Sequence, residues 1–257
     1  MLEIKDLYCG YGRGDVIKNI HLRIGGGEVF CILGPNGCGK STLLKAAARL
    51  LPFRGSVQID GKETRSFSRK ELAKKIALLG QNSPLYFPYT VEDTVFMGRY
   101  AHAPGFLGSP FSPEDRKAVD HVLQILELDT VRETLISRLS GGQLQRVFLA
   151  RTLVQDPRII LLDEPTKHLD LTHQIGLLDY LADWVKAGDR TVVTVLHDLN
   201  LALRYGKSAA LMAEGGITAR GSVGEVFSSR ALEEAYGMDI RNYMQELLER
   251  WKKNLRF

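Results

Sequence analysis

The feature that most constrains the fold of this 257-residue chain is a glycine-rich loop at positions 34–42. An apolar run of buried-strand length precedes it at 29–33, and a helix-forming run follows it at 43–48. In this setting a loop points successive backbone N–H groups inward, and the helix N-terminus adds positive potential. The pattern predicts a binding site for the phosphates of a nucleoside triphosphate. The loop consists of Gly34, Pro35, Asn36, Gly37, Cys38, Gly39, Lys40, Ser41 and Thr42.

Two side chains of this loop have a predicted chemical task. Lys40 is expected to reach the β- and γ-phosphates, and the Ser41 hydroxyl is expected to bind Mg²⁺. A glycine-rich turn that binds nothing is the alternative. The complete G-x-x-x-x-G-K-S spacing and both flanking elements disfavour that alternative.

Apolar strands alternate with helices along most of the chain, which predicts an α/β fold with a mostly parallel sheet covered on both faces. Ser68 and Glu71 form a predicted capping box for a short helix. A longer helix is expected at 171–187. The expected strands lie at 2–8, 16–24, 29–33, 56–61, 76–79, 158–163, 190–196 and 209–212.

The segment 84–154 has a different character. Thr90 with Asp93, and Ser112 before Pro113, are typical helix starts. Apolar residues at helical spacing follow at 119–128. We therefore expect an inserted helical subdomain here, with an irregular exposed loop at 100–108.

Polar residues follow directly after several predicted strands: Lys40, Gln81, Asp163 and His197. Ligands of parallel sheets bind at the carboxyl ends of the strands, so these side chains are expected to converge. Asp163 can hold Mg²⁺ through water, and the adjacent Glu164 can orient or deprotonate an attacking water. A strand-end acid that caps a nearby helix is the alternative for either residue alone.

Positions 139–143, with the sequence Leu-Ser-Gly-Gly-Gln, begin another predicted helix. Ser140 is a natural N-cap, and Gly141 and Gly142 would let a phosphate approach the helix start closely. Taken alone, the segment that ends at Gln143 is only a good helix start.

The ordered set of motifs resembles the ATP-binding cassette (ABC) superfamily. Positions 34–41 are similar to its Walker A loop, 139–143 to its signature motif, and 159–164 to its Walker B strand with the catalytic glutamate. The resemblance covers nearly the whole chain up to about position 236. Single residues match further motifs: Gln81 the Q-loop, Asp170 the D-loop, His197 the switch histidine, and Tyr11 the aromatic that stacks on adenine.

The resemblance implies a P-loop NTPase fold: a RecA-like, mostly parallel sheet core with an N-terminal antiparallel β subdomain and an inserted helical subdomain. Residues 1–240 would form this nucleotide-binding domain, with the helical subdomain at about 84–154. Residues 241–257 would form a C-terminal amphipathic helix, because apolar residues recur there at four-residue spacing beside basic ones. Packing on the protein's own surface, contact with a second copy and contact with a membrane surface are the open readings of this helix.

The resemblance also implies a mechanism that needs two copies. Head-to-tail pairing would place Ser140 and Gly142 of one copy against the γ-phosphate bound by Lys40 of the other. Glu164 would act on water, and His197 would contact the γ-phosphate. Further implied residues of the ATP and Mg²⁺ site are Gln81, Asp163, Gly141, Gln143 and Asp170.

Three residues depart from the family pattern. Cys38 replaces a usual Ser or Ala and is small enough to retain function, with a redox role of its thiol as the alternative. Lys167 replaces a small or polar residue, and its cation could join the dimer seam or be solvated. Gly80 stands where Pro is common before the Q-loop.

The transported cargo is suggested by longer local stretches. Positions 98–102, 170–174 and 197–205 are similar to ATPase subunits that import iron–siderophores, haem or vitamin B12. Alternatives are an importer of another small solute such as an oxyanion, and a non-transport ABC ATPase. A generic P-loop kinase or GTPase would leave positions 139–143 unexplained.

Partners follow from composition and resemblance together. No apolar run approaches the roughly 18 residues of a membrane span. The chain would therefore depend on separate permease subunits, work with a substrate-binding protein, and sit peripherally on the cytoplasmic face of a membrane. The net charge of +4 comes from interspersed acids and bases, so we expect no nucleic-acid partner. The permease would dock between Gln81 and Arg116, on a groove lined by Tyr86, Phe87, Tyr89, Phe96 and Met97.

Overall fold

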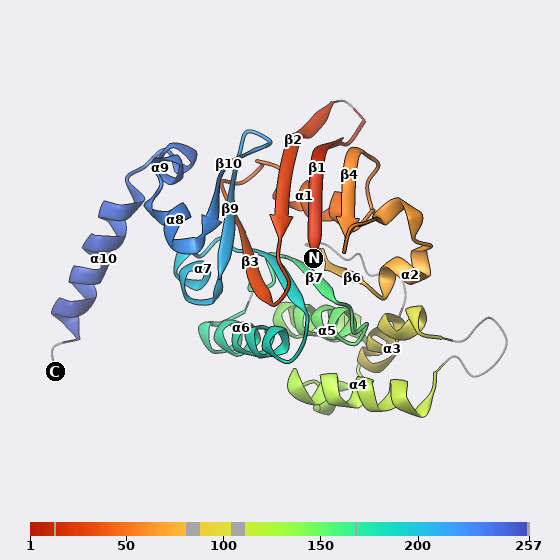
Figure 1. The fold of residues 1–257 in the computed structure, drawn as a ribbon. Coiled ribbons are helices and arrows are strands. Elements are labelled where there is room, and N and C mark those ends of the chain that lie inside the picture. Colours follow the sequence, from red (N-terminus) through yellow and green to blue (C-terminus); the bar gives the residue numbers. More distant parts are fainter. Residues whose placement is uncertain (13, 81–87, 104–110, 168, 256–257) are drawn as a thin grey trace.

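The computed structural model describes residues 1–257 except 13, 81–87, 104–110, 168 and 256–257 (Figure 1). Within the described residues the strands form an antiparallel and a mostly parallel sheet, which confirms the predicted α/β class. The antiparallel sheet has the order β2-β1-β4-β5. Its strands are β1 (Leu2–Gly10), β2 (Asp15–Ile24), β4 (Phe53–Ile59) and β5 (Lys62–Glu63).

The second sheet has the order β10-β9-β3-β8-β7-β6. Neighbouring strands from β9 to β6 run parallel, and β10 pairs antiparallel with β9 at one edge. All residues of β3, β7 and β8 are buried, as expected for strands that are covered on both faces. The strands are β3 (Glu28–Leu33), β6 (Ile76–Leu79), β7 (Ile159–Asp163), β8 (Thr191–Val195), β9 (Ser208–Ala213) and β10 (Gly216–Ser222).

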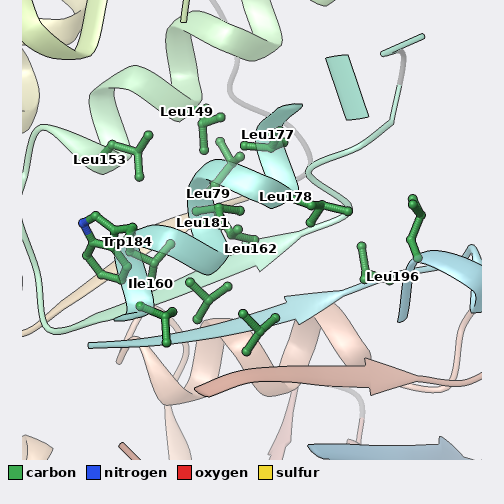
Figure 2. Close-up of a cluster of buried hydrophobic side chains, with 14 of the residues drawn as sticks. Leu79, Leu149, Leu153, Ile160, Leu162, Leu177, Leu178, Leu181, Trp184 and Leu196 are labelled. Atoms are coloured by element: carbon green, nitrogen blue, oxygen red, sulfur yellow. The ribbon is translucent and has the colours of Figure 1, made fainter. Parts of the chain in front are cut away.

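The alternation of side chains along these strands builds a core on each face. Phe30 and Ile32 of β3 face the antiparallel sheet, and α1 (Lys40–Ala47) packs into the same cluster. Ile160 and Leu162 of β7 face the opposite side, against α5 (Gly141–Leu153) and α6 (Leu171–Lys186). Figure 2 shows side chains of α6, from Leu177 to Trp184, packed over Ile160 and Leu162.

The described residues between β6 and β7 are mostly helical. The capping boxes at Ser68–Glu71, Thr90–Asp93 and Ser112–Asp115 are all formed, which confirms the predicted helix starts. The prediction of an exposed loop at 100–108 is wrong for its first residues, because 97–101 form a 3₁₀ helix and Ala101 is buried. Residues 104–108 of that prediction lie outside the described residues. Helix α2 (Arg69–Ala73) lies before β6. The helices described between β6 and β7 are α3 (Val91–Phe96), α4 (Pro113–Ile125), α5 and the 3₁₀ helices Met97–Ala101, Asp129–Val131 and Ile136–Arg138.

One buried ion pair ties these helices together. Arg99 Nε contacts Asp115 Oδ1 at 2.6 Å, and Arg99 Nη1 donates to the carbonyl oxygen of Val154 at 2.8 Å. Asp115 is 4% exposed. The pair therefore joins the 3₁₀ helix and α4 to the end of α5.

The C-terminal region adds elements that the sequence did not predict: β10, α7, α8 and α9. Helix α10 extends away from the sheets (Figure 1), and Ile240 is its one buried residue among those described. Tyr243 and Trp251 are 47% and 63% exposed. Most of α10 therefore does not pack on the protein's own surface as one reading of the sequence expected. The helices are α7 (Leu199–Tyr205), α8 (Val223–Ser228), α9 (Arg230–Tyr236) and α10 (Ile240–Asn254).

Across the part of the chain that the structure describes, no helix combines the length and apolar character needed to cross a bilayer.

Candidate functional site

The glycine-rich loop connects the buried strand β3 to α1, as the sequence predicts. Gly34, Gly37 and Gly39 have φ angles of 136°, 80° and 105°, a region that side chains with a Cβ rarely adopt. A Cβ at Gly34 would also collide with the carbonyl oxygen of Met212. The loop conformation therefore requires glycine, and it turns the chain directly into the first turn of α1.

A cavity of about 680 Å³ opens over this loop. It lies where β3, β7 and β8 end, so residues from three distant parts of the sequence meet there. Its polar lining and size suit a phosphorylated ligand. The lining residues are Val16, Asn36, Gly37, Gly39, Lys40, Ser41, Thr42, Glu164, Thr166, Lys167, Gln174, His197 and Asp198.

Lys40 is buried at 6% exposure, and its ammonium group is held by the loop itself. Its Nζ donates to the carbonyl oxygens of Gly34 and Pro35, each at 2.7 Å. These bonds satisfy a buried charge, which would otherwise carry a large desolvation cost. They also place a cation at the floor of the cavity.

Ser41 and Asp163 form an oxygen pair beside that cation. Asp163 ends β7 and is 2% exposed, and within the described residues its Oδ1 has no hydrogen-bond partner. Burial raises the pKa of Asp163 above its usual value; the hydrogen bond from Ser41 opposes this rise, and the charge of Glu164 adds to it. A buried carboxylate oxygen without a partner, next to a hydroxyl, fits the oxygen ligands that Mg²⁺ prefers.

Glu164 and His197 contact each other in the lining of the same cavity. Glu164 Oε1 lies 2.7 Å from His197 Nε2, and Glu164 Oε2 lies 3.4 Å from Lys167 Nζ. Glu164 has a φ of 55°, so the chain turns sharply after β7 and directs this carboxylate into the cavity. The arrangement places a carboxylate, an imidazole and a lysine within reach of one reacting group.

Other predicted site residues lie outside this cavity lining. Ser140 caps α5: its Oγ accepts from the Gln143 N–H at 3.3 Å, and the Ser140 N–H donates to Gln143 Oε1 at 3.0 Å. Asp170 caps α6 and contacts His173. Tyr11 is 56% exposed, with Lys45 Nζ 5.7 Å from its ring centroid.

Of the predicted residues that the structure describes, Lys40, Ser41, Glu164 and His197 line the cavity, and Asp163 contacts Ser41 beside them. Residues 140–143 and Asp170 do not belong to the same lining. Gln81 lies outside the described residues.

Five lining residues were not predicted as site residues: Val16, Thr166, Lys167, Gln174 and Asp198. Gln174 donates to the carbonyl oxygens of Thr166 and Leu169, and so holds the segment that follows Glu164. Asp198 caps α7, a signal that was readable as an acid directly before a helical run.

Cys38 belongs to the glycine-rich loop and is buried, with 6% of its surface exposed. Burial raises the pKa of its thiol, and the nearby Lys40 ammonium lowers it by less. The protonated thiol is the poorly reactive form, which favours a packing role over the redox alternative.

A second cavity, of about 450 Å³, lies on the helical part of the chain. Of the residues expected to line a docking groove, Tyr89, Phe96 and Met97 line this cavity, and Tyr86 and Phe87 lie outside the described residues. The remaining lining residues are Glu92, Asp93, Tyr100, Phe111 and Arg116.

Comparison with known proteins gives consistent matches. The family model described as ABC transporter matches residues 17–167, more than half of the chain. The ferric enterobactin transport ATP-binding protein of Escherichia coli is 40% identical over 92% of this chain and 87% of its own length. The hemin import ATP-binding protein of Streptomyces coelicolor is 41% identical over 89% of this chain and 80% of its own length.

A solved structure supports the same relationship. The dimeric structure of a bacterial ABC transporter cassette has a TM-score of 0.77 and 31% identity, and the match covers 87% of this chain and 99% of that one.

Proposed function

The chain belongs to the ABC transporter family, and from this premise we propose that it is the ATP-hydrolysing subunit of an importer of a metal chelate. The observation that carries the proposal is the convergence of Lys40, Ser41, Asp163, Glu164 and His197 at one edge of the sheet. Relatives named for ferric enterobactin and hemin support the cargo class.

ATP binds with its phosphates on the glycine-rich loop. The N–H groups of the loop and of the first turn of α1 donate to the phosphate oxygens, and Lys40 exchanges its carbonyl partners for the β- and γ-phosphates. Ser41 would hold Mg²⁺ directly and Asp163 would hold it through water, with Gln81 as a further contact. When bound, Mg²⁺ neutralises charge on the phosphoryl group.

Glu164 serves as the general base for the attacking water. Its carboxylate points into the cavity and is oriented by His197 at 2.7 Å. A base that is held in place before the reaction lowers the barrier without an orientation cost at the moment of attack. His197 also contacts the γ-phosphate, and Lys167 adds a cation beside it.

A second copy completes the site. Ser140, Gly141, Gly142 and Gln143 start α5 outside the lining of their own chain's cavity, which supports a head-to-tail dimer. In that dimer Ser140 and Gly142 face the γ-phosphate bound by the partner, so ATP joins the two copies. Asp170 lies at the same seam, and Tyr11 stacks on adenine.

The dimer acts on a separate permease at the cytoplasmic face of a membrane, with a substrate-binding protein delivering the chelate. The permease docks on the 450 Å³ cavity, where Tyr89, Phe96 and Met97 offer apolar contact surface. Hydrolysis separates the copies and returns the permease to its starting state.

Reconstitution tests the proposal. The chain is assembled with its permease and binding protein in vesicles, and uptake of a radiolabelled ferric siderophore, haem and an unchelated solute is compared with and without ATP. We expect ATP-dependent uptake of a chelate. ATP hydrolysis without uptake of any chelate would contradict the cargo class.

A further inference from the structure

The C-terminal part of the chain reaches the phosphate-binding loop through one hydroxyl group. Tyr236 is the last residue of α9, and its Oη accepts a hydrogen bond from the Gly34 N–H at 3.2 Å. The two residues are 202 positions apart in the sequence. Leu232 of the same helix is 1% exposed in the core, so packing of α9 holds the tyrosine in place.

The Gly34 N–H needs an acceptor from outside the sheet. The last pair between β3 and β9 joins Leu33 to Leu211, and Gly34 lies one residue beyond it. With a φ of 136°, Gly34 turns the chain out of the strand. A backbone N–H that loses its strand partner and is shielded from water costs free energy unless another acceptor is present. Tyr236 is that acceptor.

Gly34 also contacts Lys40, the lysine that we propose binds the phosphates. The Gly34 carbonyl oxygen accepts from Lys40 Nζ at 2.7 Å, while the Gly34 N–H is held by Tyr236. Burial raises the pKa of the Tyr236 hydroxyl, so it remains a neutral acceptor near neutral pH. Gly34 is thus fixed at both of its polar groups, one by the loop and one by the C-terminal helix.

We propose that Tyr236 is a positioning residue for the phosphate-binding loop. Its hydroxyl fixes the position of Gly34, and Gly34 in turn holds Lys40 and the start of the loop whose N–H groups bind ATP. The inference deepens the proposed function and rests on it, because the loop's task is to bind ATP. Tyr236 does not touch the nucleotide in this account. It acts through Gly34.

The test removes only the hydroxyl. Tyr236→Phe keeps the ring that packs against the core and deletes the acceptor. Loss of one hydrogen bond is expected to raise the dissociation constant of a fluorescent ATP analogue for the full chain by roughly three- to tenfold. In the permease complex KM for ATP is expected to rise by the same factor, with kcat within about twofold.

Tyr205→Phe is the matched control. Tyr205 Oη donates to Asp179 Oδ1 at 2.8 Å between α7 and α6, so this variant also loses one tyrosine hydrogen bond. We expect a lower melting temperature in both variants and weaker ATP binding only in Tyr236→Phe. Unchanged ATP affinity in Tyr236→Phe would show a merely structural role and overturn the proposal.

A measurement on the unmodified chain covers the case in which the variant does not fold. Hydrogen exchange at the Gly34 N–H is expected to be slow without nucleotide, and exchange as fast as in an unstructured peptide would overturn the proposal. Failure of the unmodified chain to bind ATP at all would instead contradict the proposed function, so the two failures are distinguishable.

Discussion

The loop at the end of β3 and the start of α5 are both glycine-containing helix starts, yet they differ in how their polar groups are used. The loop gathers partners from β7 and β8 and opens into a 680 Å³ cavity. The start of α5 satisfies itself, because Ser140 and Gln143 cap each other. The loop thus forms one side of a pocket, and the start of α5 forms a stable surface that a partner can contact. In the proposed head-to-tail dimer, this difference accounts for an ATP site whose two parts lie apart on a single chain.

The largest predicted effect lies at the cavity wall. Glu164→Gln keeps the size of the side chain, but it removes the proposed general base. We expect turnover of the permease complex to fall by roughly 10²–10⁴-fold, with ATP affinity retained. Steady-state ATPase rates and ATP titrations measure the two quantities, and near-normal turnover would remove Glu164 from this role.

The next prediction tests whether the stability of the helices between β6 and β7 can be changed without changing ATP binding in the cavity. Asp115→Asn breaks the buried pair with Arg99 and should destabilise the fold by about 3–5 kcal/mol. ATP affinity is expected to stay unchanged, because Asp115 is not among the described residues that line the cavity. Urea unfolding and ATP titration check this, and a matched loss of ATP affinity would show that the two regions are coupled.

The same pair predicts a pH dependence. Although burial alone would raise the pKa of Asp115, hydrogen bonds from Ser112 and the Arg99 guanidinium hold it below its usual value. A depressed folded-state pKa contributes stability above the unfolded pKa, and this contribution is lost as the pH falls through the folded value. The difference in unfolding free energy between Asp115→Asn and the unmodified chain should therefore begin to shrink as the pH falls below about 4 and vanish below the folded-state pKa of Asp115. A constant difference down to pH 2 would contradict this explanation.

A smaller effect concerns Lys40. Lys40→Ala removes the cation that the loop carbonyls hold, so the loss is that of one or two charge-assisted hydrogen bonds to phosphate. ATP affinity should weaken by about 10–100-fold. Isothermal titration of the full chain measures it, and an unchanged dissociation constant would contradict the loop assignment.

The smallest effect concerns Cys38. Because its thiol is buried and its pKa is raised, iodoacetamide should modify it at least about tenfold more slowly than a free thiol at pH 8. Mass spectrometry measures the labelling, and comparison with the Cys38→Ser variant separates labelling of Cys38 from that of the other cysteines. Labelling at the rate of free cysteine would restore the redox alternative.

The sequence was sufficient for the elements whose pattern is local. The apolar runs of β3, β7 and β8 and the N-cap at Ser140 could be read directly, because periodicity and capping depend on neighbours in the chain. The convergence of Lys40, Asp163 and His197 also followed, since parallel strands share one carboxyl edge.

The remainder depends on contacts between distant segments. β10 (Gly216–Ser222) has few apolar residues and forms because β9 offers an unpaired edge. The bond from Gly34 to Tyr236 spans 202 positions and leaves no local signal. Gln174 lines the cavity only because α6 returns past the end of β7. Tertiary pairing, not propensity, decides these features.

The most direct test of the two-copy site replaces Ser140 with tryptophan. The exposed Ser140 side chain can change without affecting its own chain's cavity, so the isolated chain should bind ATP with an affinity within about twofold of the unmodified chain. In the permease complex the bulky side chain should block the partner's nucleotide and lower turnover by about 100-fold or more. Full turnover by the Ser140→Trp complex would contradict the account.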